Sequence, residues 1–160
     1  MNAKVEFGVD FLSICRDLIG RSSGLDEEIN QSLYIVADAA ARLFLLEWGL
    51  TVEEGDRADA LWWERFENDK LDEIDIVVDR VIDHFSQEPK AKERILIQLV
   101  AITYLDYEVT DGEQYAFRFF SENFDLRPSE EEELIKKGFD LAIGLNYFGD
   151  QFSEAKNLSN

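Results

Sequence analysis

The stretch Thr103-Tyr-Leu-Asp-Tyr-Glu-Val-Thr-Asp-Gly-Glu113 has the pattern of a helix end, a short acidic break and a new helix start. Thr110 is followed three residues later by Glu113, which is the spacing of a capping box. In such a box the threonine oxygen accepts a hydrogen bond from a first-turn N–H, and the glutamate carboxylate accepts one from the backbone of the cap residue. This stretch therefore predicts two consecutive helices joined by a short turn.

A second copy of this pattern lies earlier in the chain, in Phe44-Leu-Leu-Glu-Trp-Gly-Leu-Thr-Val-Glu-Glu54. Each copy has an acid and an aromatic residue, then an aliphatic residue and a threonine, and finally a glutamate three residues after the threonine. The equivalent positions are Glu47 and Asp106, Trp48 and Tyr107, Leu50 and Val109, Thr51 and Thr110, and Glu54 and Glu113. We therefore expect an internal repeat of one helix–turn–helix unit, with the two units packed against each other.

The acids of the two motifs admit two interpretations. They are Glu47, Glu54, Asp106 and Glu113. A helix N-terminus carries partial positive charge and free N–H groups, so acids near it can serve for capping alone. If the two units pack face to face, the four carboxylates converge, and such hard oxygen ligands suit Ca²⁺, Mg²⁺ or Mn²⁺. An EF-hand is excluded, because placing Gly112 at the sixth loop position leaves Tyr107 and Val109 where oxygen ligands are needed.

The segment 105–113 resembles the Ala-Asp-Gly-Glu-Val-Ser-x-x-Glu signature of the TerB-like tellurite-resistance family. The residues that match the signature are Asp106, Glu108, Val109, Thr110 and Glu113. Tyr107 replaces the glycine of the family, and the first unit has Glu47-Trp48 where Asp-Gly would stand. The resemblance spans roughly residues 30 to 145. It implies an all-helical, bacterial, cytoplasmic protein linked to resistance to tellurite and other stresses, with acidic residues that are proposed to chelate metal.

Composition and charge limit the class of protein. The 160 residues are 46% hydrophobic and 12% aromatic, which suits one folded domain over 1–150 followed by a polar tail over 151–160. The net charge is −19, from 35 acids and 16 bases. This charge argues against nucleic-acid binding and against docking on an anionic membrane, because both depend on Lys and Arg. Divalent cations and proteins with basic surfaces are the expected partners.

The apolar pattern predicts an all-α, single-domain bundle of about seven helices. The expected helices are 4–19, 25–48, 51–67, 70–85, 89–107, 110–126 and 129–142. Because the stretch 95–102 is nearly all apolar, we expect the helix over 91–106 to be the buried centre. Trp62 and Trp63 cannot both face inward on one helix, so one ring is expected to be partly exposed. No run approaches the length of a membrane span and no signal stretch opens the chain, which predicts a soluble, cytoplasmic protein without membrane insertion.

A row of acids marks one helix face. Asp75, Asp79 and Asp83 follow at i, i+4 and i+8 in the helix expected over 70–85. Like charges at this spacing cost about a few tenths of a kcal/mol per pair, so the row does not serve helix stability. Two interpretations stay open, a solvated helix face and an acidic ridge that binds a basic partner.

Residues for catalysis are missing from the sequence. The chain has one histidine, His84, and one cysteine, Cys15, and it has no glycine-rich phosphate loop with its lysine. Cys15 falls in an apolar helical pattern and is expected to be buried. We therefore expect a non-enzymatic protein. One hypothesis is a TerB-like stress-resistance protein that binds a divalent cation and acts through partners. The other is an acidic inhibitor or immunity-type protein that blocks a basic target such as a nuclease.

Overall fold

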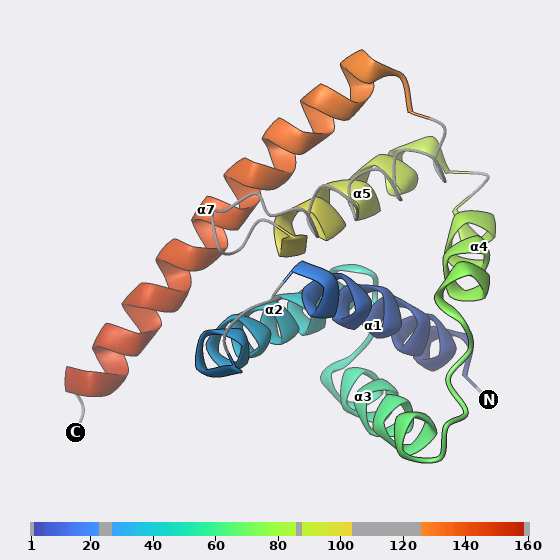
Figure 1. The fold of residues 1–160 in the computed structure, drawn as a ribbon, viewed down its shortest axis with the longest axis horizontal. Coiled ribbons are helices and arrows are strands. Elements are labelled where there is room, and N and C mark those ends of the chain that lie inside the picture. Colours follow the sequence, from blue (N-terminus) through green and yellow to red (C-terminus); the bar gives the residue numbers. More distant parts are fainter. Residues whose placement is uncertain (1, 23–26, 86–87, 104–125, 159–160) are drawn as a thin grey trace.

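The computed structural model describes residues 2–22, 27–85, 88–103 and 126–158, and within them it contains six α-helices and no strand (Figure 1). The helices are α1 (Ala3–Ser22), α2 (Glu27–Glu47), α3 (Val52–Glu67), α4 (Ile74–His84), α5 (Pro89–Thr103) and α7 (Pro128–Leu158). The all-α class is therefore confirmed. The second motif, 106–113, lies outside the described residues, so the packing of the two units stays a prediction.

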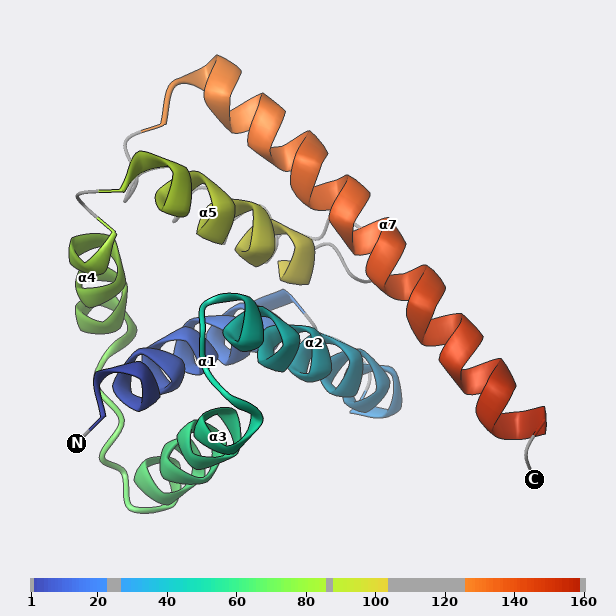
Figure 2. The same ribbon diagram turned by 180° about the vertical axis from the view of Figure 1, so that it is seen from behind.

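Helix α1 is the centre of the described bundle. It packs against α2, α3, α4 and α5, and both views show it between these helices (Figures 1 and 2). Its buried apolar side chains are Val5, Phe7, Val9, Phe11, Leu12, Ile14, Cys15 and Leu18. The expected centre was 91–106. The apolar run of α5 is buried as predicted, but among the described helices α5 packs mainly against α7, and it exposes Glu93 and Arg94.

The charges on α1 explain why its central place was not evident from the sequence. Glu6, Asp10 and Arg16 break the apolar pattern and suggest a solvent-facing side. In the structure each of them forms an ion pair with a residue of a neighbouring element. The charged positions of α1 therefore also face other parts of the protein.

Helix α7 lies along α5 (Figure 2). Their contact depends on Gly138, because a Cβ atom built there would lie 2.6 Å from the Cβ of Val100 and 3.1 Å from the carbonyl oxygen of Ile97. Real Cβ atoms do not approach other carbon atoms this closely, so the missing side chain sets how near the two helices can come. Gly138 is thus a point of close approach between α5 and α7.

The length of α7 differs from the prediction. The helix was expected to end at Ala142, but it continues through Gly144 and Gly149 to Leu158. A glycine inside a helix costs only about 1 kcal/mol relative to alanine, and no proline follows to stop the helix. The described part of the predicted tail, 151–158, is therefore helical. Although α7 has 31 residues, neither it nor another helix in the described ranges is long and apolar enough to cross a membrane.

The turn between α2 and α3 confirms the capping box of the first motif. Gly49 has a φ of 92°, a left-handed conformation that glycine adopts without strain. The Thr51 hydroxyl then accepts a hydrogen bond from the Glu54 N–H at 3.1 Å, and the Glu54 carboxylate accepts one from the Thr51 N–H at 3.0 Å.

After α3, Asp69 turns the chain with a φ of 52°, and α4 begins at Ile74, later than the predicted start at Lys70.

Candidate binding face on helix α4

Helix α4 separates apolar and acidic side chains on opposite faces. The buried face consists of Val77, Val78 and Val81. Asp75, Asp79 and Asp83 are all exposed, as the i, i+4, i+8 spacing predicts for one helix face. Ile76 is 50% exposed and lies one turn before Asp79 on the same side. We refer to Asp75, Ile76, Asp79 and Asp83 as the acidic face of α4.

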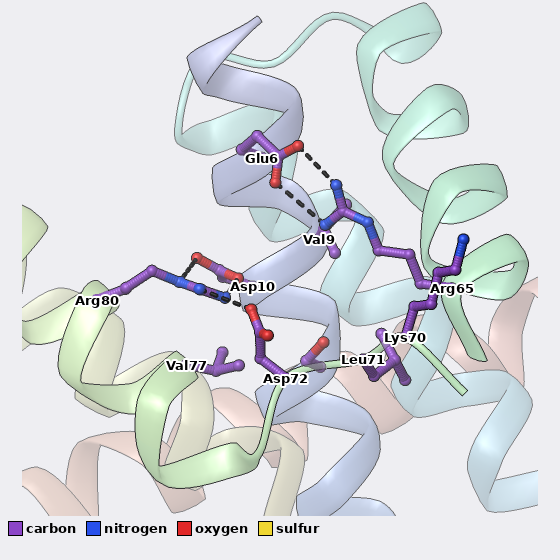
Figure 3. Close-up of a pocket in the computed structure, with 10 residues that line it drawn as sticks. Glu6, Val9, Asp10, Arg65, Lys70, Leu71, Asp72, Val77 and Arg80 are labelled. Carbon is purple, nitrogen blue, oxygen red and sulfur yellow. Dashed lines mark hydrogen bonds and ion pairs between the residues drawn. The ribbon is translucent and has the colours of Figure 1, made fainter. Parts of the chain in front are cut away.

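Arg80 fixes the orientation of this face. Its Nε and Nη2 donate to the two carboxylate oxygens of Asp10 on α1 at 3.1 and 2.8 Å, and its Nη1 donates to Asp72 at 2.7 Å (Figure 3). The hydrogen bonds to Asp10 raise the pKa of Arg80. Burial raises the pKa of Asp10 more than the bonds from Arg80 lower it. Arg80 and the three valines thus hold α4 against α1 and leave the acidic face in solvent.

A pocket of about 200 Å³ lies beside α4 (Figure 3). Its walls are Glu6, Val9, Asp10, Ser13, Arg65, Lys70, Leu71, Asp72, Val77 and Arg80. The Glu6 carboxylate accepts two hydrogen bonds from Arg65 at 3.1 and 2.8 Å, and these bonds lower the pKa of Glu6. Both guanidinium groups of the pocket are therefore paired with carboxylates. We interpret the ion pairs that line the pocket as the contacts that hold α3 and α4 on α1.

Of the four acids expected to bind a metal, two are described. Glu54 caps its own helix and also accepts a hydrogen bond from the side-chain amide of Asn2 at 2.6 Å. The Thr51 N–H is the main cause that lowers the pKa of Glu54. Glu47 accepts a hydrogen bond from the Gln98 amide at 2.7 Å and lies 3.3 Å from Arg94.

The side chain of Gln98 joins this glutamate to the core. Gln98 is 2% exposed, and its amide oxygen accepts a hydrogen bond from the Trp48 indole at 2.7 Å. Asp106 and Glu113 lie outside the described residues, so the convergence of all four acids stays a prediction. Within the described ranges, no three His, Cys, Asp or Glu side chains are grouped so that they could hold a metal ion.

Cys15 and His84, the single cysteine and the single histidine of the chain, both pack against other residues of the protein. Cys15 is buried as predicted, and burial raises the pKa of its thiol well above the usual value. The His84 ring stacks on Phe7 with 5.1 Å between ring centroids.

The ion pairs of α1 were not predicted from the sequence. One hint of them is visible at Arg16. The apolar spacing of α1 allows either Cys15 or Arg16 to face the core, so a charged residue stands where a buried one is possible. A charge at such a position indicates a buried partner on another helix, but it does not identify that partner.

Comparison with protein-family models, with curated proteins and with solved structures gives no match to this chain. The resemblance of 105–113 to the TerB-like signature therefore stays a prediction. The proposals below depend on the residues and contacts of the chain itself.

Proposed function

We propose that this protein acts without catalysis, by binding a protein partner that has a basic surface, and that the acidic face of α4 makes the contact. The observation that carries the proposal is the exposed row of Asp75, Asp79 and Asp83 on a helix whose other side is anchored in the core. A row of like charges weakens its own helix, so helix stability does not explain the row, and an exposed row of this kind suits a cationic partner.

The physical character of this face suits association with a basic protein. A net charge of −19 attracts a cationic partner over a distance and increases the rate of encounter. Ile76 adds an apolar contact among the carboxylates, which resembles the apolar centre and polar rim of protein interfaces. Among partners of this kind, a basic toxin such as a nuclease fits best, with this protein acting as its inhibitor or immunity-type partner.

Neutralising the acidic face should weaken partner binding by about tenfold or more at low salt, since three exposed charge pairs are lost. The variant carries Asp75→Asn, Asp79→Asn and Asp83→Asn. The wild type and the variant are used to capture partners from native cells, and the affinity for a captured basic protein is measured at increasing salt. We expect the affinity of the wild type to fall steeply with salt, because salt screens exposed charges.

A matched control removes the same number of acids elsewhere. The substitutions are Glu88→Gln, Glu130→Gln and Glu132→Gln, all at exposed positions outside α4. This control should bind the partner nearly as well as the wild type does. Equal losses in the two triple variants would show that only the net charge matters and would refute a site on α4.

The second candidate is a TerB-like tellurite or stress-resistance protein that binds a divalent cation through its repeated acidic motif. It rests on the repeated motif, whose first unit forms the predicted capping box between Thr51 and Glu54; capping alone gives the same geometry. In this proposal Glu47, Asp106 and Glu113 complete the set of ligands with Glu54, and the ion is Ca²⁺, Mg²⁺ or Mn²⁺.

Removal of metal should lower the melting temperature if this second candidate is correct. A ligand at a hundred times its dissociation constant stabilises a fold by about 2.7 kcal/mol. Thermal melts in EDTA and then with excess Ca²⁺, Mg²⁺ or Mn²⁺ measure this gain. The control is the Asp106→Asn, Glu113→Gln variant, because any cation also screens a highly acidic chain. A variant that gains as much as the wild type would rule out the metal site.

A further inference from the structure

One side of α3 exposes aromatic and acidic residues together. Trp63 is 40% exposed and Phe66 is 55% exposed. The exposed Glu67 lies next to Phe66 and one helical turn after Trp63. We refer to Trp63, Phe66 and Glu67 as the aromatic strip of α3. Exposed aromatic residues beside carboxylates are typical of binding surfaces rather than of a surface that only faces water.

The rings of the strip are held rigidly by the core. Phe66 stacks in parallel on the buried Trp62, with 5.2 Å between centroids and 8° between planes. Trp63 meets both rings edge-on, at 4.9 Å from Trp62 and 5.7 Å from Phe66. The Trp62 indole donates to the Ser13 hydroxyl at 2.9 Å, which fixes the ring beneath the strip. A partner would therefore meet aromatic rings that are already in place, at little cost in entropy.

The protein itself shows which group these rings accept. The guanidinium of Arg16 lies 4.3 Å from the centre of the Trp62 ring and 5.4 Å from that of Trp63. The same guanidinium forms ion pairs with Asp38 and Asp59. Tryptophan rings with carboxylates beside them thus already bind one arginine from the inside of the bundle.

We infer that the aromatic strip of α3 binds an arginine side chain of the partner, stacked on Trp63 and paired with Glu67. This inference rests on the proposed function, because it takes the partner to be basic. It adds the side chain that is recognised and a second contact surface apart from α4. Arginine fits better than lysine, since its planar group stacks on an aromatic ring while it also binds a carboxylate.

The test uses tetra-arginine amide and tetra-lysine amide peptides as probes of the full chain. Their dissociation constants are measured at low salt, and the indole N–H signals of the three tryptophans are followed by NMR. We expect the arginine peptide to bind about two- to fivefold more tightly than the lysine peptide, which is the size of an exposed cation–π contact. The Trp63 signal should shift more than the signals of Trp48 and Trp62, whose indoles donate within the protein.

Two substitutions locate the arginine preference. Trp63→Leu and Glu67→Gln should each reduce it, whereas Glu64→Gln removes an exposed carboxylate of α3 outside the strip and should leave it unchanged. Phe66→Leu tests whether the Phe66 ring also contributes to arginine binding. If it does, this substitution should reduce the arginine preference as Trp63→Leu does. Equal binding of the two peptides by the wild type, or a preference that survives Trp63→Leu, overturns the inference.

The α4 triple variant separates this inference from the proposed function. If the variant binds both peptides more weakly than the Glu88, Glu130 and Glu132 control does but still prefers arginine, both proposals are supported. If it binds both peptides as the wild type does and keeps the preference, the site on α4 fails and the aromatic strip stands. If the α4 variant binds the peptides more weakly and the wild type shows no arginine preference, the site on α4 is supported and the inference about the aromatic strip is overturned.

Discussion

Replacing Gly138 with alanine should destabilise the protein by about 2 kcal/mol or more, the usual range for an overpacked core. The new Cβ would lie 2.6 Å from the Cβ of Val100 and 3.1 Å from the Ile97 carbonyl oxygen. Neither neighbour gives way easily, because valine is stiff at its branch point and the carbonyl belongs to the backbone of α5. Helix α7 must therefore move away from α5, which opens the contact between them. Chemical denaturation of the wild type and the variant, fitted with the same dependence of unfolding free energy on denaturant concentration, measures the loss.

Gly144 provides the matched control in the same helix. A Cβ built there meets no atom of the other described residues within 4 Å, its own helix backbone aside. Gly144→Ala should therefore stabilise the protein by up to about 1 kcal/mol, through the higher helix propensity of alanine. The two substitutions are chemically identical, so the difference between them isolates the packing against α5. Equal effects of the two would refute close contact between α5 and α7 at Gly138.

Arg16→Met should lower the free energy of unfolding by about 3 kcal/mol. The Arg16 side chain is 4% exposed and pairs with Asp38 at 2.9 Å and with Asp59. Methionine keeps much of the apolar stem but leaves two carboxylates, 23% and 26% exposed, without their common cation. Their partial contact with water places the loss at the lower end of the range for a buried ion pair. The free energy of unfolding at neutral pH measures it.

Arg42→Met tests whether burial is the cause. Arg42 also connects α2 to α3 through an ion pair, with Asp56, but these side chains are 36% and 60% exposed. Solvent screens such a pair, so its removal should change stability by less than about 1 kcal/mol. If the two arginine variants lost equal stability, the ion pairs of Arg16 would not hold α1, α2 and α3 together as we conclude.

Three features could be predicted from the sequence because they depend on residues within one or two turns of a helix. Thr51 and Glu54 form a capping box whose two hydrogen bonds span only three residues. Trp62 is buried and Trp63 is 40% exposed, since neighbouring residues of a helix point in different directions. The acidic row of α4 is exposed for the same reason. Helical spacing alone determines each of these arrangements.

Only the tertiary structure decided which helix is central and which charges are paired. The charges of α1 interrupt its apolar pattern, and nothing near Arg16 in the sequence indicates that Asp38 and Asp59 are its partners. Gly138 likewise has no local signal that α5 crosses there. Such contacts join residues far apart in the chain, so they depend on how the helices pack. Local spacing therefore determined the helical class, the cap at Thr51 and the exposed face of α4, but not where α4 begins or where α7 ends. The packing of α1 among four helices determined its ion pairs, because a charge can be buried only where another element supplies the opposite charge.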